Sequence, residues 1–170
     1  KLCAVPQVDL LRRLWVNLFL DRLKVPLPRK WYYPYNHRAL MLVSGDQDGT
    51  SYRELAIVKE LLAEVGAPYT LFLMPTVQPM SPSEIADLMS SAIEIALHSD
   101  FFYSTNVPFE ETEFKRQFNM AQAQAGVKII GERGHACRWK GVLEKPTWEE
   151  RLNIQYDASL YAAMGLKGAR

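Results

Sequence analysis

The chain has 170 residues, of which 48% are hydrophobic, 23% charged and 11% aromatic, a composition typical of one globular domain with a substantial core. The net charge is +1 and no run of Lys or Arg stands out, so the sequence does not indicate binding to nucleic acid or to an anionic membrane. No apolar run approaches the roughly 18 residues of a membrane span, and the 2 cysteines are too few for a disulfide framework.

The first predicted element is an amphipathic helix within residues 8–28. Its apolar residues at helical spacing are Leu11, Leu14, Trp15, Leu18 and Leu23. Pro26 and Pro28 end the helix, and charged residues interrupt its apolar positions too often for a secretory signal. We therefore predict an N-terminal amphipathic helix and linker at residues 1–28 and an α/β domain at residues 29–170.

Beyond this helix, strand-like and helix-like segments alternate. Strands are predicted at residues 38–45, 69–74, 93–99, 127–135 and 154–161, and helices at 51–66, 81–91, 108–126 and 147–153. Ser51 and Glu54 form a capping-box pattern, and Gly126 sits where a helix C-cap belongs. Five strands separated by helices indicate a parallel α/β architecture, although periodicity does not distinguish an open sheet from a closed barrel.

Polar residues follow three of these strands. They are Asp46 and Asp48 after the first strand, His98 and Asp100 after the third, and Arg133 and His135 after the fourth. Ligands of parallel α/β proteins bind outside the carboxyl ends of the strands, in open sheets and in barrels. The chain has 3 histidines, and two of them lie at such ends. The sequence therefore predicts one site at this edge.

The residues at the ends of the first and third strands also have structural interpretations. Asp48 and Gly49 form a common turn pair, whereas Asp46 and Asp48 as functional groups would be a general base or metal ligands. His98 suits a hydrogen-bonded position near the core as well as metal binding or proton transfer. Neither interpretation is excluded by the sequence.

The segment 131–139, with the sequence "GERGHACRW", is denser in functional groups. Arg133 offers a planar fork for a carboxylate, His135 a proton or metal site, and Trp139 a flat apolar face that could stack on a sugar ring. The alternative is a polar loop whose tryptophan packs back on the sheet. A hydrolase that uses Cys137 and His135 as a Cys–His pair is a further alternative, which the close spacing on an extended segment and the lack of a third orienting group disfavour. Asp157 is either a site residue of the fifth strand or a strand cap.

The ordered motifs resemble the polysaccharide deacetylases of the chitooligosaccharide deacetylase homology type. In that family the first strand ends in Thr-Phe-Asp-Asp-Gly, the third in His-(Ser/Thr)-x-x-His, and a later strand carries an Arg-containing motif. Here "SGDQDG" (44–49), "HSDFF" (98–102) and "GERGHACRW" (131–139) stand in these places, in the same order. The flanking segments "PLPRKWYYP" and "NIQYDASLY" are similar to those of a bacterial subgroup, so the resemblance spans residues 26–161.

The resemblance implies a (β/α) barrel of the polysaccharide deacetylase type, incomplete in this chain and preceded by an N-terminal helix. It implies that N- or O-acetyl groups are removed from a carbohydrate by water activated on zinc or a similar divalent metal. Asp46 then takes the role of general base, oriented by Arg133, and His98 that of a metal ligand. The family's catalytic-acid histidine would lie beyond Arg170, and the family's location is extracellular or in the cell envelope.

Two positions depart from the family pattern. The second aspartate of the first motif falls on Gln47, whose amide is a weak neutral ligand, and the second histidine falls on Phe102, which cannot bind metal. The residues assigned from sequence are Asp46, Arg133 and His135 as catalytic, Asp48, His98 and Asp100 as metal ligands, and Trp139 and Asp157 as substrate-binding, with His135 as a further candidate ligand. The alternative is a catalytically degenerate deacetylase fold that acts as a glycan-binding or structural module of a larger protein.

Overall fold

The structure is a computed structural model that describes residues 7–23, 35, 37, 40–101 and 107–159. The chain divides into two compact units, Lys1–Met41 and Leu42–Arg170. The boundary predicted between residues 28 and 29 lies outside the described residues, as does Phe102.

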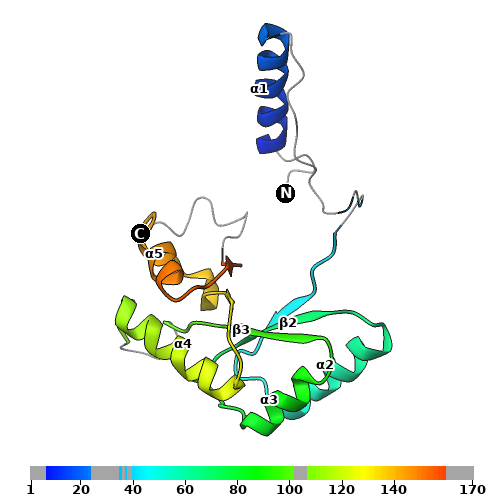
Figure 1. Cartoon of the computed structure of the whole chain (residues 1–170), viewed down its shortest axis with the longest axis vertical. Coiled ribbons are helices and arrows are strands. Elements are labelled where there is room, and N and C mark those ends of the chain that lie inside the picture. Colours follow the sequence, from blue (N-terminus) through cyan, green and yellow to red (C-terminus); the bar gives the residue numbers. More distant parts are fainter. Residues whose placement is uncertain (1–6, 24–34, 36, 38–39, 102–106, 160–170) are drawn as a thin grey trace. The chain divides into compact units, whose positions relative to one another are not determined.

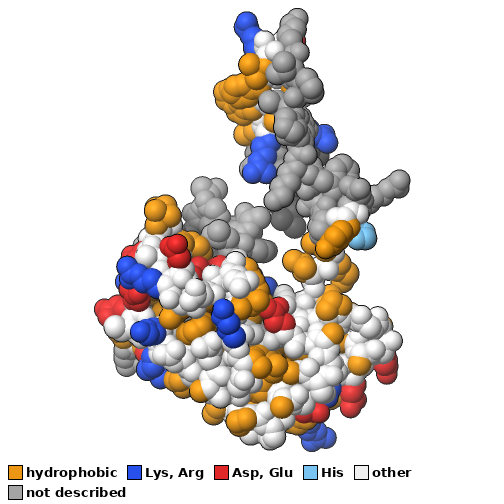
Figure 2. All heavy atoms as spheres, in the orientation of Figure 1, with side chains coloured by type: hydrophobic (Ala, Val, Ile, Leu, Met, Phe, Trp, Pro, Cys, Tyr) orange, Lys and Arg blue, Asp and Glu red, His pale blue; other side chains and the backbone are white. Residues whose placement is uncertain are grey.

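The first unit contains the predicted N-terminal helix, α1 (Gln7–Leu23). Hydrophobic side chains gather along its surface (Figure 2). Those with exposed fractions between 49% and 60% are Leu10, Leu11, Leu14, Trp15, Leu18, Phe19 and Leu23. Among the described residues, no helix has the length and hydropathy that a bilayer crossing requires.

The second unit is built on a five-stranded sheet in which strand order follows chain order. The strands are β1 (Ser44–Asp46), β2 (Tyr69–Leu73), β3 (Ile93–Leu97), β4 (Gly131–Glu132) and β5 (Tyr156–Asp157). Every neighbouring pair is parallel. This pairing confirms the predicted parallel architecture. The sheet curls into half of a barrel, so the architecture is an incomplete barrel and not a flat open sheet.

Helices connect the strands. They are α2 (Tyr52–Glu64), α3 (Pro82–Met89), α4 (Glu111–Ala125) and α5 (Glu144–Arg151), with a short 3₁₀ turn η2 (His135–Cys137) after β4. Figure 1 shows α2, α3 and α4 along one side of the strands. The predicted capping box of Ser51 and Glu54 is present, and Gly126 ends α4 in the left-handed conformation with φ 66°.

Strand alternation decides which side chains face the helices and which face the concave inner side of the sheet. Leu97 belongs to the hydrophobic core beneath the helices, so His98, the next residue, turns toward the inner side. Leu97 pairs with Glu132, which places Glu132 on the helix side and Arg133 on the inner side. The carboxyl ends of the strands therefore present His98 and Arg133 together on the concave face.

The first strand is shorter than predicted. It begins at Ser44, and the apolar residues before it are exposed, with exposed fractions of 54% for Leu40, 84% for Met41 and 82% for Leu42. β1 lies at the edge of the sheet with β2 as its neighbour, and the bond from the Thr70 amide to the Val43 carbonyl continues that pairing by one residue. The prediction of strand at residues 40–43 is therefore wrong.

Candidate metal centre

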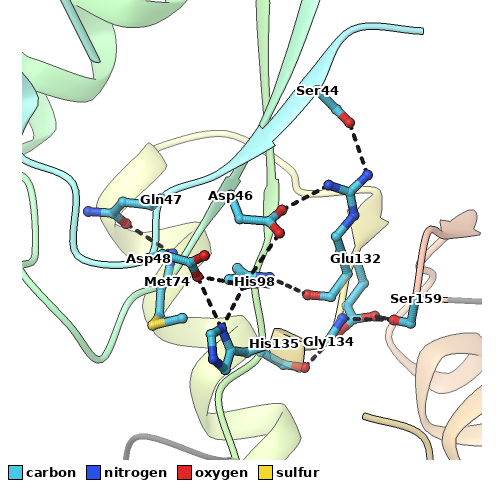
Figure 3. Close-up of polar contacts among 12 residues, drawn as sticks. Ser44, Asp46, Gln47, Asp48, Met74, His98, Glu132, Gly134, His135 and Ser159 are labelled. Carbon is cyan, nitrogen blue, oxygen red and sulfur yellow. Dashed lines mark hydrogen bonds and ion pairs between the residues drawn. The ribbon is translucent and has the colours of Figure 1, made fainter. Parts of the chain in front are cut away.

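The two aspartates that follow the first strand reach the same end of the sheet by a turn. β1 ends at Asp46, and Asp48 and Gly49 then adopt positive φ angles of 43° and 81°, a conformation that glycine adopts freely and Asp tolerates. The predicted turn is thus present, and it brings the Asp48 carboxylate beside that of Asp46 (Figure 3). The structural and functional interpretations of Asp48 are compatible.

Gln47, between these aspartates, is fully buried and its amide is occupied by backbone partners. Its Oε1 accepts a hydrogen bond from the Met74 amide at 3.0 Å, and its Nε2 donates to the Gln78 carbonyl at 3.1 Å. These bonds tie the turn after β1 to the loop after β2. Gln47 is therefore a structural residue, and Asp48 places its carboxylate beside the two imidazoles.

Three atoms of types that can ligate a metal ion come together from three strand ends, in a group that we call the candidate metal centre (Asp48, His98 and His135). Asp48 Oδ1 lies 3.1 Å from His98 Nε2 and 3.0 Å from His135 Nδ1, and the two nitrogens are 3.2 Å apart. Figure 3 shows the three side chains pointing toward one another. The sequence assigned a catalytic role to His135, with metal binding as a further possibility, and the structure brings it among the ligand atoms.

The hydrogen bonds of His98 determine which of its nitrogens carries the proton. Nδ1 lies 2.6 Å from the carbonyl oxygen of Arg133, and a carbonyl only accepts, so Nδ1 carries the proton in the neutral ring. Nε2 then presents a lone pair to the Asp48 carboxylate, which also only accepts. Two acceptors 3.1 Å apart repel each other unless a cation or an added proton lies between them.

The donor set fits a zinc-like divalent cation. One carboxylate oxygen and two imidazole nitrogens form a known catalytic zinc set, which leaves a fourth position open. Ligand atoms about 2.0–2.1 Å from a tetrahedral zinc lie about 3.3 Å from one another, and the three separations here are 3.0–3.2 Å. The Asp48 side chain is 47% exposed, so the position is accessible from solvent.

Asp46 lies next to this centre and is held by Arg133. The guanidinium donates from Nη1 to Asp46 Oδ1 at 2.9 Å and from Nη2 to the Ser44 hydroxyl at 2.9 Å, and it stacks over the Phe72 ring at 4.1 Å. The other carboxylate oxygen of Asp46 is 3.9 Å from His98 Nε2. One oxygen is thus fixed by arginine while the other faces the candidate metal centre.

The remaining predicted site residues are not members of this group. Asp100 is buried, its backbone amide and carbonyl are both bonded by the Gln117 side chain at 2.7 Å, and it is not among the metal-binding groups of the described residues. Trp139 is half-buried, with the Lys145 ammonium 5.1 Å from its ring centre. Asp157 is paired with the same ammonium. The substrate-binding roles of Trp139 and Asp157 remain predictions.

Cys137 is a free, half-buried cysteine in η2. Burial raises the pKa of its thiol, which disfavours the thiolate that a nucleophile requires. This agrees with the sequence argument against a Cys–His nucleophile.

A second polar cluster was not predicted. This Lys145 cluster consists of Lys145, Glu132, Glu149, Asp157 and Ser159. Lys145 is fully buried, and its ammonium lies 2.5 Å from Glu132 Oε2, 2.8 Å from Glu149 Oε1 and in close contact with Asp157. Burial raises the pKa of Glu132 to about 7, and it also raises the pKa of Glu149. For Asp157, burial opposes ionisation, but hydrogen bonding with Glu149 and the Lys145 charge lower its pKa.

No family model matches the chain, and no curated protein matches it significantly. Its fold does match solved structures. A Mycobacterium smegmatis protein provisionally described as a polysaccharide deacetylase aligns with a TM-score of 0.56 and 16% identity, over 70% of this chain and 50% of that one. A family 4 carbohydrate esterase from Streptomyces lividans, in complex with acetate, aligns with a TM-score of 0.54 and 15% identity, over 70% of this chain and 62% of that one.

A third match is a mutant of a CE4 family pseudoenzyme with restored enzymatic activity, with a TM-score of 0.52 and 14% identity over 68% of this chain and 42% of that one. The chain thus has the fold of the polysaccharide deacetylases, as its motifs predicted. It spans about half the length of these structures, between 42% and 62%, and it forms part of the (β/α) barrel, preceded by an N-terminal helix. At these identities the similarity establishes the fold.

Proposed function

We propose that the chain is a metal-dependent hydrolase that removes N- or O-acetyl groups from a carbohydrate. One observation carries the proposal. His98 Nε2 and Asp48 Oδ1 lie 3.1 Å apart, and His135 Nδ1 completes the group. This arrangement suits a bound cation, on a fold whose solved examples include a carbohydrate esterase in complex with acetate.

Asp48, His98 and His135 would hold a zinc-like ion, with His135 rather than Asp100 as the third ligand. When bound, such an ion polarises the acetyl carbonyl and lowers the pKa of water. Asp46 accepts the proton of the attacking water, because its free oxygen faces the centre while Arg133 holds the other. Water adds to the carbonyl carbon and the C–N or C–O bond breaks. The proton taken up by Asp46 passes to the leaving sugar nitrogen or oxygen, and acetate is released. Trp139 is proposed to stack on the sugar.

A second candidate is a degenerate module that binds glycans or has a structural role. Gln47 favours it, because a buried structural amide replaces the second aspartate of the family motif. Pseudoenzymes with this fold exist, as one of the matched structures shows for its own protein. In this case a proton would lie within the group of Asp48, His98 and His135.

The test combines metal binding with acetate release. Purified protein is analysed for zinc before and after chelation, and acetate is measured with N-acetylated chitooligosaccharides and with O-acetylated xylan. We expect one zinc per chain and acetate from one of the two substrates. Asp46→Asn should retain zinc and lose about 10²–10⁴-fold in rate, the usual contribution of a general base, whereas Asp87→Asn on α3 should leave both unchanged.

The two candidates predict different outcomes. No zinc at millimolar supply, with the fold intact, would refute the hydrolase and support the degenerate module. Bound zinc with no acetate released from either substrate would contradict the carbohydrate deacetylase and retain the metal centre. Acetate release that persists in Asp46→Asn would show that another group accepts the proton.

A further inference from the structure

We infer that Lys145 is a positioning residue for the candidate metal centre. It fixes, through Glu132 and Ser159, the backbone segments that present the ligands. The inference rests on the proposed function, since the side chains that it positions are those proposed to bind metal and to act as the base. Nothing in the chain's resemblance to deacetylases assigns a role to Lys145.

The two clusters lie on opposite faces of the same strand ends. Alternation along β3 places His98 on the concave side and Ser99 on the helix side, and pairing with Leu97 places Glu132 on the helix side. Arg133 follows Glu132 and turns to the concave side. The Lys145 cluster therefore acts on the candidate metal centre through shared backbone, not through side-chain contact.

The first connection runs through Glu132. One of its oxygens lies 2.5 Å from the Lys145 ammonium, and the other accepts a hydrogen bond from the Ser99 hydroxyl at 2.5 Å. Ser99 directly follows His98, and its carbonyl accepts from the His135 amide at 2.8 Å. Fixing Ser99 thus fixes the backbone at both metal-binding histidines.

The second connection runs through Ser159. Its hydroxyl accepts from the Gly134 amide at 2.7 Å and from Lys145 Nζ at 3.2 Å, and it donates to Glu132 Oε2 at 3.2 Å. A hydroxyl has one donor and two acceptor sites, so every site of Ser159 is used and its orientation is fixed. Gly134 lies between Arg133 and His135, and its conformation therefore sets the directions of both side chains.

The energetics support positioning as the contribution of the cluster. Lys145 lies on α5, whereas Glu132 and Asp157 come from β4 and β5, and both lysine and Glu132 are fully buried. Buried ion pairs often add no stability over well-packed hydrophobic residues of similar volume. In this cluster the ion pairs fix the orientation of the backbone segments that carry the partners, because each bond requires a particular geometry. Functional sites require their groups within about 0.5 Å of the productive geometry.

The experiment removes the connecting hydroxyls one at a time. Ser99→Ala and Ser159→Ala should each weaken zinc binding about 10–100-fold by calorimetry, the usual effect of losing a partner that orients a metal ligand. Tyr52→Phe is the matched control, since it removes one hydroxyl that donates to Asp87 at 2.8 Å between α2 and α3. Tyr52→Phe should lower the free energy of unfolding about as much as each serine variant does. It should leave zinc affinity unchanged.

Less than a twofold change in zinc affinity for both serine variants, in a wild type that binds zinc, would overturn the inference. A similar weakening in Tyr52→Phe would also overturn it, because the effect would then reflect general destabilisation. If the wild type binds no zinc, the proposed function fails and amide hydrogen exchange of the metal-free protein decides the inference. Ser99→Ala and Ser159→Ala must then speed exchange at Arg133 and His135 at least tenfold, and unchanged exchange refutes the positioning role.

Discussion

The candidate metal centre and the Lys145 cluster have similar spacing of their ligand atoms, but only the Lys145 cluster contains a cation from the chain itself. Each contains three side chains whose ligand atoms lie within 4.8 Å of one another: Asp48, His98 and His135 in the first, and Glu132, Glu149 and Asp157 in the second. The second group encloses a fully buried lysine, which neutralises it from within. Among the described residues, no Lys or Arg pairs with Asp48, whose partners are the two imidazoles.

This difference separates an internally satisfied site from one that is open to a ligand. Two buried carboxyl groups and a half-buried aspartate surround a cation that the chain itself supplies. Two imidazoles and one half-exposed carboxylate have no lysine or arginine among them, and their ligand atoms are of the types that a metal ion binds. The two clusters should therefore respond differently when a charged member is removed.

The largest expected effect is a loss of stability when the cation of the Lys145 cluster is removed. Lys145→Met keeps most of the side-chain volume and leaves Glu132, Glu149 and Asp157 without their common partner. Removing one member of a buried charge group typically costs about 3–5 kcal/mol, because the remaining charge is uncompensated. We expect a loss of this size in the free energy of unfolding, measured by urea denaturation at pH 7 in the absence of zinc.

The control for this variant is Lys59→Met, which removes a lysine from a partly exposed pair with Asp87, whose side chains are 18% and 44% exposed. A pair in contact with solvent should contribute much less to stability than the fully buried Lys145 cluster. Equal losses for the two lysine variants would contradict the view that the Lys145 cluster depends on its cation.

The second effect is a dependence of stability on pH to which Glu132 contributes. Burial also raises the pKa of Glu149, to about 8, and this acts in the same direction. Burial raises the pKa of Glu132 from 4.5 to about 7 in the folded protein, so between these values the folded chain holds a proton that the unfolded chain releases. The resulting stabilisation is fully present below about pH 4.5 and is lost as the pH rises through about 7. The pKa change corresponds to about 3 kcal/mol at most.

Glu132→Gln tests this dependence, because glutamine mimics the protonated carboxyl and does not titrate. The free energy of unfolding of the wild type should fall between pH 5 and pH 8, and that of Glu132→Gln should fall less. The lowered pKa of Asp157 acts below its ordinary value of 3.8, outside this range. Identical slopes for the two proteins would show that Glu132 is ionised throughout.

The third effect concerns the open site. His98→Ala removes the nitrogen that faces both other ligands, and zinc affinity should fall by about 100-fold or more, since even the loss of an orienting partner costs 10–100-fold. His37→Ala is the matched control, because His37 belongs to the other unit and is not in a metal-binding group of the described residues. Calorimetry with zinc measures both, and equal losses would place the binding site elsewhere.

The sequence predicted the parallel α/β fold and the edge at which the polar residues meet, because hydrophobic periodicity and strand-end position are local signals. It overestimated the first strand, since apolar composition at residues 40–42 does not reveal that β1 lies at the edge of the sheet. The same signals could not show over how many residues neighbouring strands pair. β3 pairs with β4 at a single position, Leu97 with Glu132.

Within the site, the sequence identified Asp46, Asp48, His98, Arg133 and His135, which the structure brings together. It assigned Asp100 as a metal ligand and His135 as catalytic, whereas the structure groups His135 with Asp48 and His98. Which residues after each strand face the concave side depends on the tertiary structure. Nothing in the sequence indicated a role for Lys145, an ordinary lysine near the start of a short helix. Buried charge networks depend on contacts between distant segments, here residues 132, 145 and 157.

The smallest expected effect is the change in stability when the carboxylate of the candidate metal centre is neutralised. Asp48→Asn removes the charge of the candidate metal centre and keeps the side-chain shape, and asparagine tolerates the φ of 43° at this position. Without zinc, the free energy of unfolding should change by about 0.5 kcal/mol or less, as for most surface substitutions, because the Asp48 side chain is 47% exposed. Zinc at 100 times its Kd should stabilise the wild type by about 2.7 kcal/mol and the variant by much less. A loss above 2 kcal/mol in the zinc-free variant would instead identify Asp48 as a structural partner of the two histidines, and the open site would then resemble the Lys145 cluster in being satisfied from within.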